Sequence, residues 1–182
     1  MTNKIPLLID TDPGMDDALA LRMAFKDPNH ELVGLTIAAG NVGLEHPVRN
    51  ALKLCEVVGR QDVPVYAGCA DPLLHPAVDA AHVHGRDGFG DIGFTPAAGA
   101  VESEHAALAI LRLSHEHAGQ LLLVALGPLT NIAVALKLDP TLPSRIKRFV
   151  VMGGAVSAHG NITPAAEFNI AFDPEAAHIV FQ

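Results

Sequence analysis

The sequence has few cysteines and no recognisable secretory signal. Its 182 residues include only Cys55 and Cys69, too few for the disulfide framework of a small secreted protein. The first residues, MTNKIPLLIDTD, reach acidic side chains before a signal-like apolar core develops. We therefore expect a protein of a reducing, cytoplasmic compartment.

Basic residues are also scarce. The chain has 12 Lys and Arg against 20 Asp and Glu, a formal net charge of −8, and no cluster of basic residues. This pattern argues against nucleic acid or an anionic membrane surface as the main partner. One uncharged stretch, residues 118–136, could resemble a membrane span, but it contains glycine, proline and asparagine. It is more typical of a buried strand, a polar turn and a helix.

Apolar material, in contrast, is plentiful. Hydrophobic residues make up 49% and charged residues 18% of the chain, and the mean hydropathy is +0.30. This composition provides a core and excludes a disordered acidic tail. The sequence contains no internal repeat, low-complexity tract or interdomain linker. Since a domain usually has roughly 150 residues, we predict a single domain over residues 1–182.

Segments with strand and helix character alternate along the chain. Short apolar runs typical of buried strands occupy residues 5–10, 32–38, 63–66, 121–125 and 149–152. Helical patterns occupy residues 16–25, 47–58, 103–117 and 129–138. This alternation predicts an α/β fold with an open, mainly parallel sheet and helices on both faces. Residues 68–99 are too long for a plain connection and predict a functional loop or lid.

Polar clusters follow four of the predicted strands. They comprise residues 10–17, 40–41, 126–131 and 153–169. The carboxyl ends of parallel strands meet at one edge of a sheet, and ligands bind at that edge in open α/β folds. We therefore expect these clusters to form one site.

The densest cluster is D-T-D-P-G-M-D-D, which contains four aspartates and no basic residue. Two carboxylates about 4 Å apart repel by roughly 4 kcal/mol at an effective dielectric near 20. Protons, helix dipoles or a cation must relieve this repulsion. A hard divalent cation, Ca²⁺ or Mg²⁺, does so most simply with oxygen ligands.

The aspartates and nearby histidines have other interpretations. Asp16 could cap the following helix while the other aspartates are solvated. An EF-hand loop is excluded, because Gly14 and Met15 stand where that loop needs Asp or Asn and then Gly. The Asp-x-Asp-Gly-Thr pattern of haloacid dehalogenase-like phosphotransferases fits only in part. A zinc site at His82-x-His84 lacks a clear third ligand.

Several motifs together resemble one known family. DTDPGMDDALAL, AAGN, HGRDGFG, ALGPLTNIA, VVMGG and EFNIAFDPEAA occur in this order between residue 7 and about residue 180. They are similar to motifs of the inosine/uridine-preferring nucleoside hydrolases. The resemblance implies a Rossmann-like nucleoside hydrolase fold and a Ca²⁺-dependent enzyme that hydrolyses the N-glycosidic bond of ribonucleosides to free base and ribose.

The resemblance also implies roles for individual residues. Asp12 and Asp17 would bind Ca²⁺ through carboxylates and Leu126 through its backbone carbonyl, with Asp12 as general base for the attacking water. The ribose hydroxyls would be held by Asp16, Asn41, Asn161, Glu167 and Asn169. Met152 and Phe168 would pack near the sugar, His84 would lie near the base, and Asp10 would support the site from behind.

Members of this family continue well beyond residue 182, with a further Asp at the Ca²⁺ site and, in several members, a His that protonates the leaving base. We therefore expect a C-terminally incomplete domain. Three hypotheses follow: a nucleoside hydrolase, a non-catalytic module that binds ribosides and metal, or a Mg²⁺-dependent phosphatase-like hydrolase using Asp10 and Asp12. The resemblance also implies a homo-oligomer, a dimer or a tetramer. The preference for purine or pyrimidine bases is not predicted by the sequence.

Overall fold

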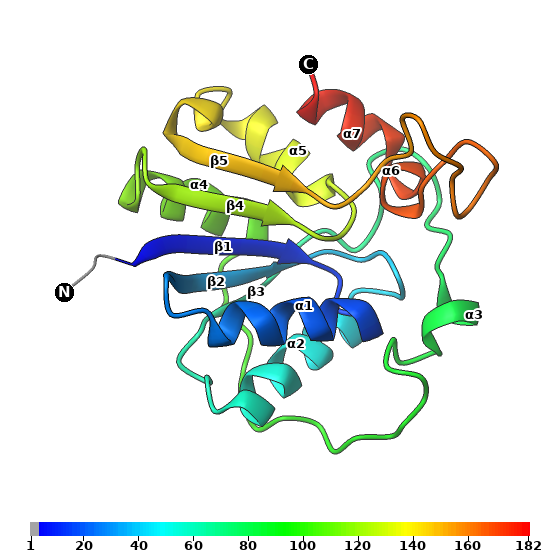
Figure 1. The fold of residues 1–182 in the computed structure, drawn as a ribbon, viewed down its shortest axis with the longest axis horizontal. Coiled ribbons are helices and arrows are strands. Elements are labelled where there is room, and N and C mark those ends of the chain that lie inside the picture. The colour runs from blue at the N-terminus through cyan, green and yellow to red at the C-terminus, as the bar shows by residue number, and fades with distance from the viewer. Residues whose placement is uncertain (1–3) are drawn as a thin grey trace.

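The computed structural model describes residues 4–182 and shows an α/β fold built on a five-stranded sheet (Figure 1). All neighbouring strands are parallel, and their order is β3-β2-β1-β4-β5. The strands are β1 (Ile5–Thr11), β2 (His30–Ile37), β3 (Val65–Ala67), β4 (Leu121–Ala125) and β5 (Ile146–Val151). The predicted fold class is thus confirmed.

Helices pack on both sides of this sheet. Two helices lie on one face, α1 (Met15–Lys26) and α2 (Glu45–Val58), and three on the other, α4 (Ala106–Glu116), α5 (Thr130–Leu138) and α7 (Pro174–Val180). Each face of the sheet has its own hydrophobic core, and alternate residues of β1 point into one or the other. Leu8 packs with α4 and α5, whereas Leu7 and Ile9 pack with α1 and α2. Coverage is uneven, because Val150 of β5 stays 38% exposed on the α1 side.

Short elements complete the chain. They are α3 (Ala81–His84), the 3-10 helix η1 (Leu142–Arg145) and α6 (Phe168–Phe172). The long segment of residues 68–99 contains α3 and no other helix or strand. Residues 118–136 form a strand, a turn and a helix, as predicted. No helix within residues 4–182 combines the length and apolar character needed to cross a membrane.

The ends of some elements differ from the sequence-based expectation. β5 begins at Ile146, earlier than predicted, because Lys147 and Arg148 interrupt its apolar pattern at a partly exposed edge. α4 begins at Ala106 rather than at residue 103. His105 caps this helix by accepting a hydrogen bond at Nδ1 from the Ala107 backbone N–H at 3.1 Å.

The strand order places a topological switch point between β1 and β4. From β1 the chain adds β2 and β3 on one side, and then returns to add β4 and β5 on the other. The connections that leave the carboxyl ends of β1 and β4 therefore diverge and leave an opening at that edge. The polar clusters predicted from the sequence all lie near this opening.

Candidate active site

A cavity of about 220 Å³ lies at this edge of the sheet. Ten of the residues proposed from the sequence line it: Asp16, Asp17, Asn41, His84, Leu126, Met152, Asn161, Glu167, Phe168 and Asn169. Four further lining residues were not predicted: Ala80, His82, Val83 and Ile162. No Lys or Arg of the described chain lines the cavity. Segments from five parts of the sequence, residues 16–17, 41, 80–84, 126 and 152–169, thus meet around one small, acidic opening.

The turn between β1 and α1 is closed by Asp17. Its Oδ2 accepts a hydrogen bond from the Gly14 backbone N–H at 3.0 Å, and its Oδ1 accepts one from the Thr11 hydroxyl at 2.9 Å. The alternative that Asp16 caps the helix is wrong, because its side chain is 75% exposed and makes no capping bond. Asp16 is instead free to face the cavity, while Asp17 is held rigidly.

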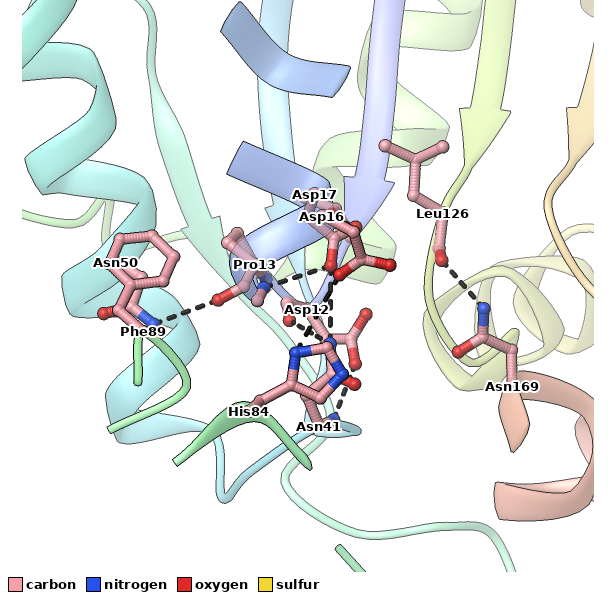
Figure 2. A network of polar contacts seen from close by, with 12 residues as sticks. Asp12, Pro13, Asp16, Asp17, Asn41, Asn50, His84, Phe89, Leu126 and Asn169 are labelled. Carbon is pink, nitrogen blue, oxygen red and sulfur yellow. Dashed lines mark hydrogen bonds and ion pairs between the residues drawn. The ribbon is translucent and has the colours of Figure 1, made fainter. Parts of the chain in front are cut away.

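Asp12 is buried beneath the cavity and fastened to Asn41. The Asn41 backbone N–H donates to Asp12 Oδ2 at 2.7 Å, and the Asn41 amide donates to the Asp12 carbonyl at 3.1 Å. The same amide lies 3.4 Å from Asp17 Oδ2 (Figure 2). Asn41 therefore joins the two carboxylates that were predicted to bind a cation.

The Asp12 carboxylate lies in a narrow slot between Gly40 and Gly127, where a side chain at either position would clash with it. A Cβ on Gly40 would lie 2.1 Å from Asp12 Oδ2, and a Cβ on Gly127 would lie 2.3 Å from Oδ1. Asp12 is 1% exposed, and its Oδ1 has no hydrogen-bond partner within residues 4–182. A buried carboxylate oxygen without a partner is costly unless a proton or a cation satisfies it.

The pKa shifts of Asp12 and Asp17 also indicate that these carboxylates need a proton or a cation. Burial raises the pKa of Asp12 well above its ordinary value, and the negative charge of Asp17 raises it further. Burial also raises the pKa of Asp17, against the lowering effect of the Gly14 N–H, and the charge of Asp16 adds to the increase. The two ionised carboxylates are thus destabilised by loss of water and by each other.

Asp10 lies outside the cavity. It is fully buried, and its Oδ2 accepts hydrogen bonds from Thr36 Oγ1 at 2.6 Å and Asn131 Nδ2 at 3.0 Å. Burial raises the pKa of Asp10 to about 7. The Asp10 carbonyl accepts from the Leu126 N–H at 2.8 Å, so this residue joins β1 to the start of the β4–α5 turn. The four aspartates of the cluster thus occupy different environments.

The opposite wall of the cavity is built around α6. Glu167 caps this helix, with Oε1 accepting from the Asn169 N–H at 2.9 Å and Oε2 from the Gly154 N–H at 2.8 Å. The Asn169 amide donates to the Leu126 carbonyl at 2.8 Å and to the Met152 carbonyl at 3.1 Å. The Leu126 carbonyl, the proposed backbone ligand, therefore already accepts one bond and has one lone pair left.

Two more residues of this wall lie closer to solvent. Asn161 Oδ1 accepts from the Phe168 N–H at 2.8 Å, and Met152 is 49% exposed. Phe168 packs against Phe172 with ring centroids 5.8 Å apart. These side chains form an apolar and amide rim around the buried polar groups.

His84 approaches the cavity from α3. Its side chain is 14% exposed, and Nδ1 lies 3.9 Å from Asp16 Oδ1 without a hydrogen bond. His82 lines the same cavity, but no cluster of three or more His, Cys, Asp or Glu side chains suited to a metal occurs in residues 4–182. The His82-x-His84 zinc hypothesis therefore gains no third ligand from the described chain.

Sequence reasoning missed several residues that hold the site in place. Thr11, Thr36 and Asn131 orient the buried aspartates, and Asn131 Oδ1 also accepts from the Cys69 N–H at 2.8 Å. Asn131 belongs to the motif ALGPLTNIA, whose presence alone does not indicate this role. Asn50 lies on the buried face of α2. A polar residue in this otherwise apolar stripe indicates a buried hydrogen bond and could have been predicted.

The fold and the cavity define a class: α/β proteins with a carboxylate-rich small-molecule site at the switch point of a parallel sheet. Comparison with known proteins is more specific. The chain belongs to the inosine-uridine preferring nucleoside hydrolase family, whose sequence model matches residues 7–182. The resemblance predicted from the motifs is thus confirmed.

Named relatives support this membership. The chain is 46% identical over 177 residues to uridine nucleosidase 1 of Arabidopsis thaliana, covering 96% of this chain and 52% of the relative. It is 43% identical over 178 residues to the pyrimidine-specific ribonucleoside hydrolase RihB of Escherichia coli, covering 98% of this chain and 56% of the relative. The chain thus spans about half the length of these curated relatives.

Solved structures agree with the fold. A plant nucleoside hydrolase, the PpNRh1 enzyme, superposes with a TM-score of 0.95 at 40% identity and covers 98% of this chain and 57% of its own. A purine-preferring ribonucleoside hydrolase from Gardnerella vaginalis superposes with a TM-score of 0.93 at 38% identity, with 97% and 57% coverage. The observed arrangement is therefore that of nucleoside hydrolases over the matched part.

Proposed function

We propose that the cavity binds a ribonucleoside and that the protein hydrolyses its N-glycosidic bond to free base and ribose. The observation that carries this proposal is the convergence of ten residues, predicted from the family resemblance, on one cavity of carboxylates and amides. Ribose hydroxyls both donate and accept hydrogen bonds, so a mixture of Asp, Glu and Asn suits them. The relatives named above are nucleosidases and ribonucleoside hydrolases.

The proposal includes Ca²⁺ as the cofactor. Asp12 has a buried oxygen without a partner within the described residues, and both Asp12 and Asp17 accept hydrogen bonds from Asn41. The Leu126 carbonyl has a free lone pair. These are oxygen donors of the kind that Ca²⁺ prefers, and the residues present fit it. Three protein ligands are fewer than the usual ~6–8, so water and ribose hydroxyls would supply the others. When bound, the cation would lower the pKa of the attacking water.

Each side chain then has a defined task. The Asp12 carboxylate takes the proton of the attacking water. Asp16, Asn41 and Asn169, with Asn161 and Glu167, hold the ribose hydroxyls. Positive charge develops on the ribose ring as the glycosidic bond breaks, and the surrounding carboxylates stabilise that state more than the neutral substrate. Met152 and Phe168 pack against the sugar, His84 lies near the base, and Asp10 supports the turn.

The proposal is made for the ribose half of the substrate. Relatives are named for uridine, for pyrimidines and for purines, so both base classes belong in the assay. Assembly into homodimers or homotetramers is part of the proposal. A cytoplasmic location is also proposed, because Cys55 and Cys69 are both free thiols.

Ribose release from inosine and uridine tests the proposal. We expect release that depends on Ca²⁺, stops with a chelator and is lost in Asp12→Asn. Ribose binding without release would favour the non-catalytic alternative. Phosphate release from a phosphoester, lost in Asp10→Asn, would favour the phosphatase-like alternative, which the burial of Asp10 outside the cavity does not support.

A further inference from the structure

A buried amide on α2 fastens the loop that carries His84. Asn50 is 1% exposed, and its Nδ2 donates to the Pro13 carbonyl at 3.0 Å and to the Asp87 carbonyl at 2.9 Å. Figure 2 shows the bond to Pro13, in the turn between Asp12 and Gly14. Both amide protons are thus used to join the aspartate turn to the glycine-rich loop.

The loop of residues 84–91 forms one unit. The Gly90 N–H donates to the His84 carbonyl at 2.7 Å, so the loop closes on itself. Asp87 Oδ1 accepts from the Phe89 N–H at 2.7 Å and from the Asp91 N–H at 2.9 Å. Asp87 and His84 therefore belong to the same hydrogen-bonded loop.

His84 depends on such anchors for its position. Its Nδ1 has no hydrogen-bond partner within the described chain. On the other side of α3, the Ala80 N–H donates to the Asn41 carbonyl at 2.8 Å. His84 lies between this bond and the Asn50 contact, and it packs so closely on Gly14 that a Cβ there would lie 2.7 Å from Nδ1.

We propose that Asn50 is a positioning residue. Its two hydrogen bonds, called the clasp below, hold residues 84–91 against the aspartate turn and so fix the position of the His84 imidazole over the cavity. Asn50 does not line the cavity, so it acts through His84. The consequence for nucleoside binding rests on the proposed function. The role of Asn50 in positioning His84 does not depend on that function, so positioning and nucleoside binding can be tested separately.

Two variants release the clasp from opposite sides. Asn50→Leu removes both donors at similar volume. Gly88→Ala places a Cβ 3.0 Å from Asn50 Nδ2 at a φ of +78°. Gly93→Ala is the matched control, since it lies in the same segment at φ +67° with nothing within 4 Å. Cys55→Ala controls for a core change on α2.

The readouts are the His84 imidazole NMR signals and the rate of trypsin cleavage after Arg86, whose side chain is 91% exposed. For Asn50→Leu and Gly88→Ala we expect shifted His84 signals and cleavage about tenfold faster, as for the loss of one buried and one partly buried hydrogen bond in a locally opening loop. Both controls should keep the wild-type signals and cleave within about twofold of its rate.

The proposal is overturned if the two clasp variants match the controls in both readouts. If Asn50→Leu fails to fold, Gly88→Ala alone decides. In hydrolysis assays Asn50→Leu should raise KM and leave kcat nearly unchanged, because a binding contact is lost; an unchanged KM contradicts the positioning role. Wild-type protein that releases no ribose, together with shifted His84 signals in the variants, would refute the proposed function and support the clasp.

Discussion

Two buried carboxylates, Asp12 beneath the cavity and Glu167 in its α6 wall, differ in how their oxygens are satisfied. On the carboxylate wall, formed by Asp12, Asp17 and Asn41, one oxygen of Asp12 has no partner within residues 4–182. On the amide wall, formed by Asn161, Glu167 and Asn169, both oxygens of Glu167 accept backbone N–H groups. Similar burial therefore has different consequences, because one charge is satisfied by the fold and the other needs a further group.

The largest expected effect comes from closing the Asp12 slot. Gly40→Ala places a Cβ 2.1 Å from Asp12 Oδ2, so the turn must move. We expect the free energy of unfolding to fall by about 3 kcal/mol. Gly43→Ala is the control, because its Cβ meets nothing within 4 Å. Urea denaturation of both variants checks this, and equal stability of the two would show that the slot is not tight.

Removing the charge of Asp12 should abolish the response to calcium. In Asp12→Asn the unneutralised buried charge is gone, so stability in chelator should be maintained or increased. Wild-type protein should gain about 2.7 kcal/mol at a free Ca²⁺ concentration of 100 times Kd, and the variant should gain nothing. Denaturation with and without Ca²⁺ measures this. A variant that is strongly destabilised in chelator would mean that Asp12 has a structural role like that of Glu167.

Glu167→Ala should show the reverse pattern. The variant loses the cap of α6 and the bond to the Gly154 N–H, at a cost of about 1–2 kcal/mol in unfolding free energy. Its stabilisation by Ca²⁺ should remain, because Glu167 belongs to the amide wall. Loss of that stabilisation in a folded variant would contradict the division between the two walls.

The smallest effect is expected at the rim of the amide wall. Asn161 is exposed and accepts one hydrogen bond, from the Phe168 N–H. Asn161→Ala should lower the unfolding free energy by about 0.5 kcal/mol, at the low end for one hydrogen bond. It should weaken riboside binding measured by calorimetry. Unchanged riboside affinity would remove Asn161 from the proposed ribose site.

The two walls also differ in how far the sequence predicts them. The carboxylate wall follows a continuous apolar strand and is concentrated in residues 10–17, so its signal is local. The amide wall depends on α6, a helix of five residues that no periodicity marks. Its cap Glu167 reaches Gly154, 13 residues away, inside a polar segment.

The supporting network could not be predicted for a similar reason. Asn131 and Asp10 are 121 residues apart in sequence, and Asn50 reaches Pro13 and Asp87 across 37 residues each way. Such contacts depend on the strand order β2-β1-β4, which apolar runs alone do not specify. The class of fold and the edge that holds the site follow from patterning, whereas the partners of each polar group follow from topology.

Calcium binding to the 182-residue chain tests the central claim most directly. Isothermal titration calorimetry should show one Ca²⁺ site in the wild-type protein, loss of that site in Asp17→Asn, and wild-type binding in Asp62→Asn, a surface carboxylate outside the cavity. No binding by the wild-type chain, or undiminished binding by Asp17→Asn, would contradict the account of the carboxylate wall as a cation site.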